Sequence, residues 1–104
     1  MELLEYLEPS GKSPFGRWFD GLDAHAAAKV TVALTRLKQG NLSNVKGVGE
    51  GVLEYRIDFG PGYRLYFGRD GESLVILVGG GIKAGQHRDI ANAKIRWADY
   101  KRRK

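Results

Sequence analysis

The spacing of apolar positions predicts one strand and two helices in the first part of the chain. Residues 2–7 (ELLEYL) form a short strand candidate, which the turn-prone run PSGKSP closes. Ser13 and Pro14 have the residue types of a helix N-cap and a first helical position, and the apolar residues that follow recur at helical spacing. Asp23 can cap a second, alanine-rich helix that runs to about Gln39, where a glycine is a natural stop.

The second half of the chain changes to a period of two and predicts a meander of three strands. In residues 52–59 (VLEYRIDF) apolar and polar positions alternate, as in a half-buried strand, and the GPG that follows is a reversal signal. A second alternating strand begins at Tyr63 and stops at the turn Asp70-Gly71. Residues 73–80 (SLVILVGG) are almost continuously apolar, as expected for an interior strand that is covered on both faces.

A helix from about Gln86 to the end completes the predicted order strand, helix, helix, strand, strand, strand, helix. Its apolar residues Ile90, Ala93, Trp97 and Tyr100 fall on one side. This order suggests an α+β fold in which helices lie on one face of a mostly antiparallel sheet. A chain of 104 residues that is 42% apolar is long enough for one core, so we expect residues 1–104 to form a single domain.

Composition excludes several classes of protein. No stretch approaches the ~18 to 20 consecutive apolar residues of a membrane span, and the N-terminus lacks the features of an export signal, so we expect a cytoplasmic protein with no membrane contact. The chain has no cysteine, and its two histidines are 62 positions apart without a carboxylate cluster. The glycine runs match no phosphate-loop motif. We therefore expect neither a metal ion nor a cofactor.

The net charge of +5 resides in the C-terminal tail. Residues 94–104 hold six of the 17 Lys and Arg residues and one of the 12 Asp and Glu residues, so the rest of the chain is neutral. Clustered cations release counterions when they meet a polyanion, which favours a nucleic acid or an acidic protein as partner. Cations also complement the dipole at a helix C-terminus, and the charge pattern alone leaves both interpretations open.

The outward face of the predicted hairpin gathers two arginines and a tyrosine. A tight GPG turn places Arg56 opposite Tyr66. It places Arg64 opposite Asp58, and all four side chains lie on the face away from the apolar positions. Two guanidinium groups on rigid strands suit a phosphodiester and the negative charge that develops on it.

The same arginines also fit a simpler structural role. Arg64 can pair with Asp58, and Arg56 with Glu54 or Glu50, as ordinary cross-strand ion pairs. Because surface ion pairs are common and weak, the pattern taken alone favours this alternative.

A second polar cluster follows the last predicted strand, where three glycines end the apolar run. It contains Lys83, Gln86, His87, Arg88 and Asp89. Polar groups at a strand end beside a helix start suit anion binding. His87 is a candidate general acid or base, whereas His25 in the alanine-rich helix is expected to be a solvent-facing bystander. Strand termination explains the glycines taken singly.

Two segments of the chain resemble the HigB-like killer proteins of the RelE/ParE toxin superfamily. The run from Asn44 to Phe67 (NVKGVGEGVLEYRIDFGPGYRLYF) is similar to the central signature of that branch. The later GGGIKAGQHRDIANAK is similar to the GGxKxxQxxDI segment of the branch, with Lys83, Gln86, Asp89 and Ile90 in register. The likeness spans nearly the whole chain, and two long segments in the right order are specific.

The resemblance implies the toxin of a type II toxin-antitoxin system, with a RelE/ParE-like sheet cradled by helices. It implies cleavage of messenger RNA, commonly on the ribosome, without a metal ion. The implied partners are mRNA, the ribosome and a cognate antitoxin, often a helix-turn-helix protein, through which operator DNA would be contacted. The working surface of the family carries over onto Lys46, Arg56, Arg64, Tyr66 and Lys83, which agrees with the hairpin patch.

We hypothesise that an RNA 2′-hydroxyl attacks the adjacent phosphate at this surface, with Arg56 and Arg64 stabilising the pentavalent charge. Tyr66 would stack on a base or transfer a proton, the two lysines would hold flanking phosphates, and His87 is an optional proton carrier. The candidate catalytic residues are therefore Arg56, Arg64, Tyr66, Lys83 and His87. The candidate RNA-binding residues are Lys46, Gln86, Arg88, Lys101 and Arg102.

Two other functions stay open at this point. One is a ParE-type inhibitor of DNA gyrase that cuts no nucleic acid, although the Arg, Tyr and Lys residues of the sheet favour a nuclease. The other is a non-enzymatic RNA-binding or structural module that uses the basic tail. The sheet lacks the paired aromatic signature of an RNA-recognition motif, which counts against this module.

Overall fold

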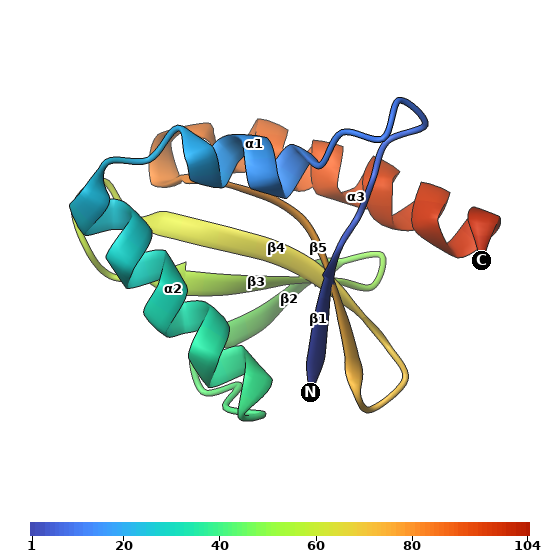
Figure 1. Ribbon diagram of the computed structural model, residues 1–104, viewed down its shortest axis with the longest axis horizontal. Helices are drawn as coiled ribbons and strands as arrows, with labels where there is room; N and C mark the ends of the chain where they lie inside the picture. Colours follow the sequence, from blue (N-terminus) through green and yellow to red (C-terminus); the bar gives the residue numbers. More distant parts are fainter.

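The computed structural model describes residues 1–104 and contains three α-helices and a five-stranded sheet (Figure 1). In chain order the elements are β1 (Glu2–Glu5), α1 (Pro14–Asp20), α2 (Ala24–Lys38), β2 (Val45–Gly49), β3 (Val52–Ile57), β4 (Tyr63–Asp70), β5 (Leu74–Ile82), a short 3₁₀ turn η1 (Lys83–Gly85) and α3 (Gln86–Arg103). The predicted α+β class is confirmed. None of the helices combines the length and the apolar character that crossing a membrane requires.

The strands lie in the order β1-β5-β4-β3-β2. β1 runs parallel to β5, and every other neighbouring pair is antiparallel, so the predicted mostly antiparallel sheet is confirmed. The edge strand β2 was not predicted, because its sequence VKGVG alternates poorly and contains two glycines. It pairs with β3 around a register shift between Gly47 and Gly49, and its residues are exposed or half-buried.

Helices cover both faces of the sheet, so the prediction that they lie on one face is wrong. α1 and α2 pack on one face in a cluster that includes Phe15, Val30, Leu37, Tyr55, Leu65 and Phe67. α3 packs on the other face in a cluster that includes Val52, Tyr66, Ile76, Ala93 and Trp97. The cause is that β4 and β5 are buried at successive positions, so each of their two faces has to be removed from water.

Glycines in the central strands let the helices approach closely. The ring of Trp97 in α3 lies where a Cβ at Gly68 would stand, and the ring of Trp18 in α1 lies where a Cβ at Gly80 would stand. Each tryptophan therefore packs directly on the backbone of the sheet. This contact fixes the distance of α1 and α3 from β4 and β5.

The helix caps follow the sequence signals. The Ser13 hydroxyl accepts a hydrogen bond from the Gly16 backbone at 2.9 Å, and the Asp23 carboxylate accepts one from the Ala26 backbone at 2.9 Å. Ser13 also donates to Glu5 at 2.5 Å, which ties the start of α1 to the end of β1. The predicted start of both helices is confirmed.

The β3–β4 register differs from the predicted one. Arg56 lies opposite Arg64, and Glu54 lies opposite Tyr66. The reason is that β3 ends at Ile57 and a five-residue loop, residues 58–62, replaces the tight turn that the GPG motif suggested. A shift of two positions leaves each side chain on its expected face but gives it a different neighbour.

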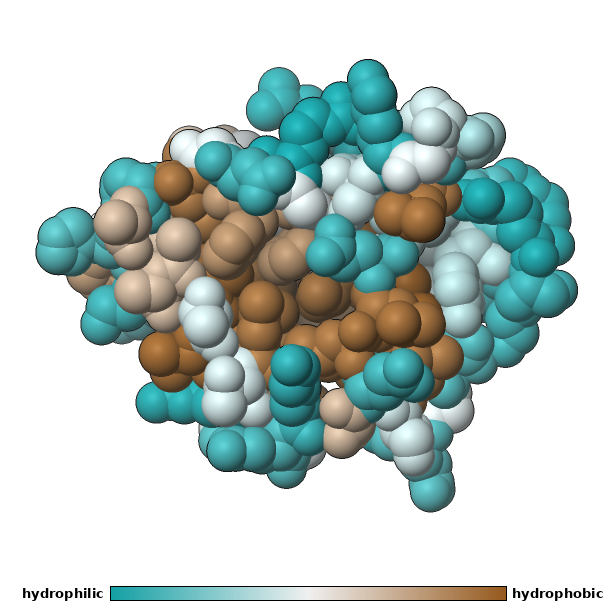
Figure 2. Space-filling model, in the orientation of Figure 1, coloured by the Kyte–Doolittle hydropathy of each residue, from teal (hydrophilic) through white to brown (hydrophobic).

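The face of the molecule seen in Figure 2 carries an apolar groove between β1 and α2, with a volume of about 620 Å³. Leu4 and Leu7, which line it, are 45% and 49% exposed. The N-terminal amine of Met1 donates to the Lys38 carbonyl at 2.8 Å and thereby joins the start of β1 to the end of α2.

Candidate functional site

A buried carboxylate, Glu54, lies at the centre of a polar cluster beneath the start of α3. Its side chain has 0% exposure. Arg56 donates from Nε to one carboxylate oxygen at 3.0 Å, and Gln86 donates from Nε2 to the other at 2.8 Å. The Nε atom of Arg64 lies 3.6 Å from that second oxygen. Burial alone would raise the pKa of Glu54, but the hydrogen bonds from Arg56 and Gln86 hold the pKa below its ordinary 4.5.

The hairpin patch is not the open surface that strand alternation predicted. α3 covers this face, so Arg64 is 7% exposed and Tyr66 is 0% exposed. The Tyr66 hydroxyl has no hydrogen-bond partner, and burial together with the charge of Glu54 raises the pKa of Tyr66 well above its ordinary 10. Tyr66 is therefore a protonated residue in the floor of the site, and its burial is incompatible with the predicted stacking on an RNA base.

The arginines make only part of the ion pairs that the simpler interpretation predicted. The pair between Arg56 and Glu54 is present. The pair between Arg64 and Asp58 is absent, because Arg64 turns toward the loop and donates from Nη1 to the Gly62 carbonyl at 2.9 Å. The side chain of Arg56 is 48% exposed, and only its Nε atom is engaged, so its two terminal nitrogens stay free for an anion.

Two exposed lysines flank the arginines. Lys46 in β2 pairs with Glu54 of β3. It therefore lies on the strand next to Arg56 and two strands from Arg64. Lys83 begins η1, and its backbone donates to the Gly62 carbonyl at 2.9 Å, the same oxygen that Arg64 binds. We call Lys46, Arg56 and Lys83 the cationic rim. One carboxylate beneath three rim cations and Arg64 leaves an excess of positive charge, which suits a phosphodiester.

The predicted proton carrier lies outside this cluster. His87 is exposed and lines a separate groove of about 580 Å³ with Glu50 and Lys94. Arg88 is exposed as well, in the first turn of α3 two residues after Gln86, and has no ion-pair partner. No three His, Cys, Asp or Glu side chains converge as ligands for a metal ion.

The basic tail is largely used within the molecule. Arg102 and Arg103 form ion pairs with Asp99 at 2.8 and 2.7 Å, and Lys104 forms one with Asp70 at 2.7 Å. The Lys101 amine lies 5.6 Å from the centre of the Trp97 ring. At about 1.5 Å per helical residue, Lys101 and Arg102 lie more than ~20 Å along α3 from the Glu54 cluster. The structure therefore does not bring these two predicted RNA-binding residues to the site.

Two cations of the site were missed from the sequence. Lys29 and Arg36 of α2 line a groove of about 290 Å³ together with Arg56, so positive charge continues from the rim onto α2. Their spacing of seven residues, two helical turns, is a signal that places both on one side of a helix. The central position of Glu54 was missed too, although it shares a strand face with Arg56 by alternation.

Comparison with known proteins places the chain in a family. A family model described as phage derived protein Gp49-like (DUF891) matches residues 17–102 and so contains every member of the Glu54 cluster. An uncharacterized protein of Haemophilus influenzae is 42% identical over 82 residues, which cover 78% of this chain and 83% of that relative. The chain belongs to the Gp49-like family of phage-derived proteins, a toxin-like family related to addiction modules.

Proposed function

We propose that this protein is the toxin of a type II toxin-antitoxin system, a HigB-like member of the RelE/ParE superfamily that cuts messenger RNA. The observation that carries the proposal is the direct pairing of Arg56 with Arg64 across two rigid strands, with Lys46 and Lys83 beside them. Such an arrangement suits a nuclease, because the transition state of phosphodiester cleavage gathers negative charge on one phosphate. The toxin-like family supports the same proposal.

The proposed reaction needs only groups of the RNA and the protein. The 2′-oxygen attacks the adjacent phosphorus and forms a new P–O bond, while the bond from phosphorus to the 5′-oxygen breaks. The 2′-hydroxyl gives its proton to a side chain that acts as general base, and the 5′-oxygen takes up a proton as it leaves. The products are a 2′,3′-cyclic phosphate and a 5′-hydroxyl. Arg56 offers its free nitrogens to the phosphate oxygens, and the charge of Arg64 acts from beneath.

We assign proton transfer to exposed side chains, of which Lys83 belongs to the rim and His87 lies outside it. Lys83 and His87 are exposed and flank Gln86 along the chain. A histidine is the side chain best suited to take and give a proton at neutral pH. His87 has to reach the rim from its own groove, so we propose it as the proton carrier of the complex with RNA. Tyr66 supports the floor of the site in this proposal and contacts no base.

We propose the partners that the resemblance to HigB-like toxins implies, and the charge of the cationic rim is compatible with them. A cytoplasmic toxin of this kind would meet mRNA on the ribosome, where phosphates surround the rim. A cognate antitoxin, a helix-turn-helix protein, would neutralise it and contact operator DNA. The ion pairs of the tail count against the RNA-binding module, because few of its cations stay free.

The test is inducible expression in a bacterial host, with and without the neighbouring gene, followed by mapping of mRNA 5′ ends. We expect growth arrest and new cuts in translated messages that the neighbouring gene suppresses. The Arg56→Ala variant should lose both effects, since removing one such donor costs about 10²- to 10³-fold in rate. Arg69→Ala is the matched control, because Arg69 lies toward the other end of β4 and donates to the Glu72 carbonyl.

Arrest with intact messages would overturn the nuclease. It would favour the gyrase inhibitor, which a supercoiling assay with purified gyrase tests directly.

A further inference from the structure

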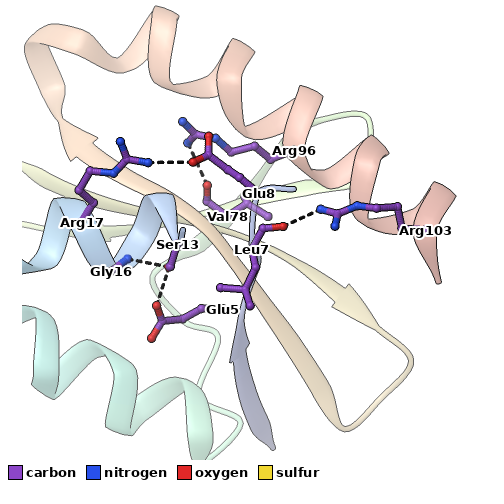
Figure 3. A network of polar contacts seen from close by, with 9 residues as sticks. All are labelled: Glu5, Leu7, Glu8, Ser13, Gly16, Arg17, Val78, Arg96 and Arg103. Carbon is purple, nitrogen blue, oxygen red and sulfur yellow. Dashed lines mark hydrogen bonds and ion pairs between the residues drawn. The ribbon is translucent and has the colours of Figure 1, made fainter. Parts of the chain in front are cut away.

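A second polar pocket lies between α1 and α3, beyond Leu77, where the pairing of β1 with β5 ends. Its volume is about 380 Å³, and Gly80 of β5 lines it. Figure 3 shows Glu8, from the segment after β1, between Arg17 of α1 and Arg96 of α3. Arg17 pairs with Glu8 at 2.8 Å, and Arg96 donates to the Val78 carbonyl of β5 at 3.0 Å.

One carboxylate in this pocket has no partner. Asp89 is half-buried, yet neither of its oxygens accepts a hydrogen bond or forms an ion pair within the protein. It occupies the space where a Cβ at Gly81 would stand, so a larger residue at position 81 would displace it. Burial raises the pKa of Asp89 despite the opposing charges of Arg88 and Arg96. A half-buried acceptor without a donor favours a ligand that supplies N–H groups.

The charges of the pocket disfavour a phosphate. Arg17 and Arg96 are balanced by Glu8 and Asp89, whereas the cationic rim carries an excess of positive charge. The lining residues also include Trp18, which has an aromatic ring, and Asn92, which has a side-chain amide. A neutral, flat ligand with donors and acceptors along one edge fits these groups, and this is the chemistry of a nucleobase.

Among the bases, the carboxylate selects guanine. The N1–H and N2–H groups of guanine point the same way and match the two oxygens of one carboxylate, while its O6 accepts from an arginine or an amide. Adenine presents an acceptor at N1, which a carboxylate repels. Cytosine and uracil each offer a single donor position on that edge.

We propose that the Asp89 pocket, lined by Asp89, Trp18, Asn92 and Arg96, binds a guanine base of the RNA next to the cleaved bond. This inference rests on the proposed function for the position of the base. Asp89 lies over Gly81, which pairs with Arg64 in the register of β4 and β5. Adjacent strands are about 4.8 Å apart, so Gly81 lies one strand from Arg64 and two strands, about 10 Å, from Arg56, a distance that suits a base beside the cleaved bond.

The first experiment compares ligands on the unaltered protein by calorimetry with GMP, IMP and AMP. All three carry the same ribose phosphate, so differences report the base. IMP lacks only the N2 amine, and we expect GMP to bind roughly tenfold or more tightly than IMP and AMP, as for other paired contacts to a base edge. Equal affinities for GMP and IMP would overturn the pocket assignment.

The second experiment compares Asp89→Asn with Asp58→Asn. Asp58 is an exposed carboxylate without an ion pair, so it is the matched control and should keep the preference for GMP. Asp89→Asn should lose that preference, and retention of it would overturn the inference. If Asp89→Asn fails to fold, the comparison of GMP with IMP on the unaltered protein still tests whether the pocket recognises guanine.

The outcomes separate this inference from the nuclease. Preference for GMP without any RNA cuts would support the guanine pocket and contradict the proposed nuclease activity. RNA cuts without guanine beside them, together with equal binding of GMP and IMP, would support the nuclease activity and contradict the guanine pocket.

Discussion

Replacement of Glu54 by glutamine tests whether the buried carboxylate stabilises the folded protein. The change keeps the shape of the side chain and removes its charge. Arg64, with 8% of its side chain exposed, would then be a nearly buried cation whose closest remaining partner is the Gly62 carbonyl. The structure predicts a large loss of stability for an exchange of nearly equal volume.

The expected magnitude follows from the two charged partners of the carboxylate, Arg64 and Arg56. Removing one member of a buried ion pair costs about 3 to 5 kcal/mol, because the other charge stays buried without compensation. Arg56 is 48% exposed and adds little. The 3.6 Å separation of Arg64 from Glu54 places the effect near the lower end, at about 3 kcal/mol. Since domains of this size are stable by about 5 to 15 kcal/mol, the loss is a large fraction of the total.

The effect depends on pH in a defined direction. Although burial raises it, the pKa of Glu54 in the folded protein lies below the ordinary 4.5, because Arg56 and Gln86 stabilise the charged form. The contribution of the carboxylate is therefore complete above 4.5 and is lost as the pH falls through the lower, folded value. The pKa of Asp89 is raised by burial and acts in the opposite direction, but it does so in both proteins and cancels in the difference.

The assay is urea unfolding followed by circular dichroism at pH 7 and at acid pH. Glu50→Gln is the matched control, because Glu50 is 73% exposed and pairs with Lys94 at 3.3 Å, so its loss should stay within about 0.5 kcal/mol. We expect Glu54→Gln to lose about 3 kcal/mol at neutral pH and to approach the unaltered protein in acid. A loss below about 0.5 kcal/mol, or the same loss at both pH values, would refute the reasoning.

Three further changes test the packing, a helix cap and the tail. Gly68→Ala should lose about 1 to 3 kcal/mol in urea unfolding, because a Cβ there overlaps the Trp97 ring, whereas Gly47→Ala meets open space and should change little. Ser13→Ala should lose about 1 kcal/mol in thermal unfolding through the lost N-cap of α1; an unchanged midpoint would contradict this role. Deletion of residues 101–104 should lower the melting temperature, since it removes ion pairs, but keep the RNA cuts; loss of the cuts would assign the tail to the site.

The sequence predicted those features that depend on neighbouring residues. The caps at Ser13 and Asp23 act within one helical turn, so their residue types and spacing are sufficient signals. The alternation of residues 52–57 marks a strand for the same reason. The α+β class then followed from the order of the elements.

Features that depend on contacts between residues far apart in the chain could not be predicted from the sequence pattern in the same way. The β3–β4 register depends on loop geometry, and the motif GPG is compatible with the predicted three-residue turn and with the observed longer loop. The burial of Tyr66 depends on α3 covering the second face, which single-strand alternation does not encode. Alternation did place Arg56 and Arg64 on one face, and that placement is confirmed.

Glu54 also has a role that its charge alone would not predict. By accepting from Nε of Arg56 it holds one edge of the planar guanidinium group and leaves the two terminal nitrogens without a partner in the protein. If the carboxylate only neutralised the rim, Glu54→Gln would bind RNA more tightly and cut it faster. If it positions Arg56, the variant should bind RNA more tightly but cut it more slowly, measured as Kd and single-turnover rate at a temperature where the variant is folded. Faster cutting would contradict the positioning role. It would mean that Glu54 stabilises the fold and slows the cleavage of RNA.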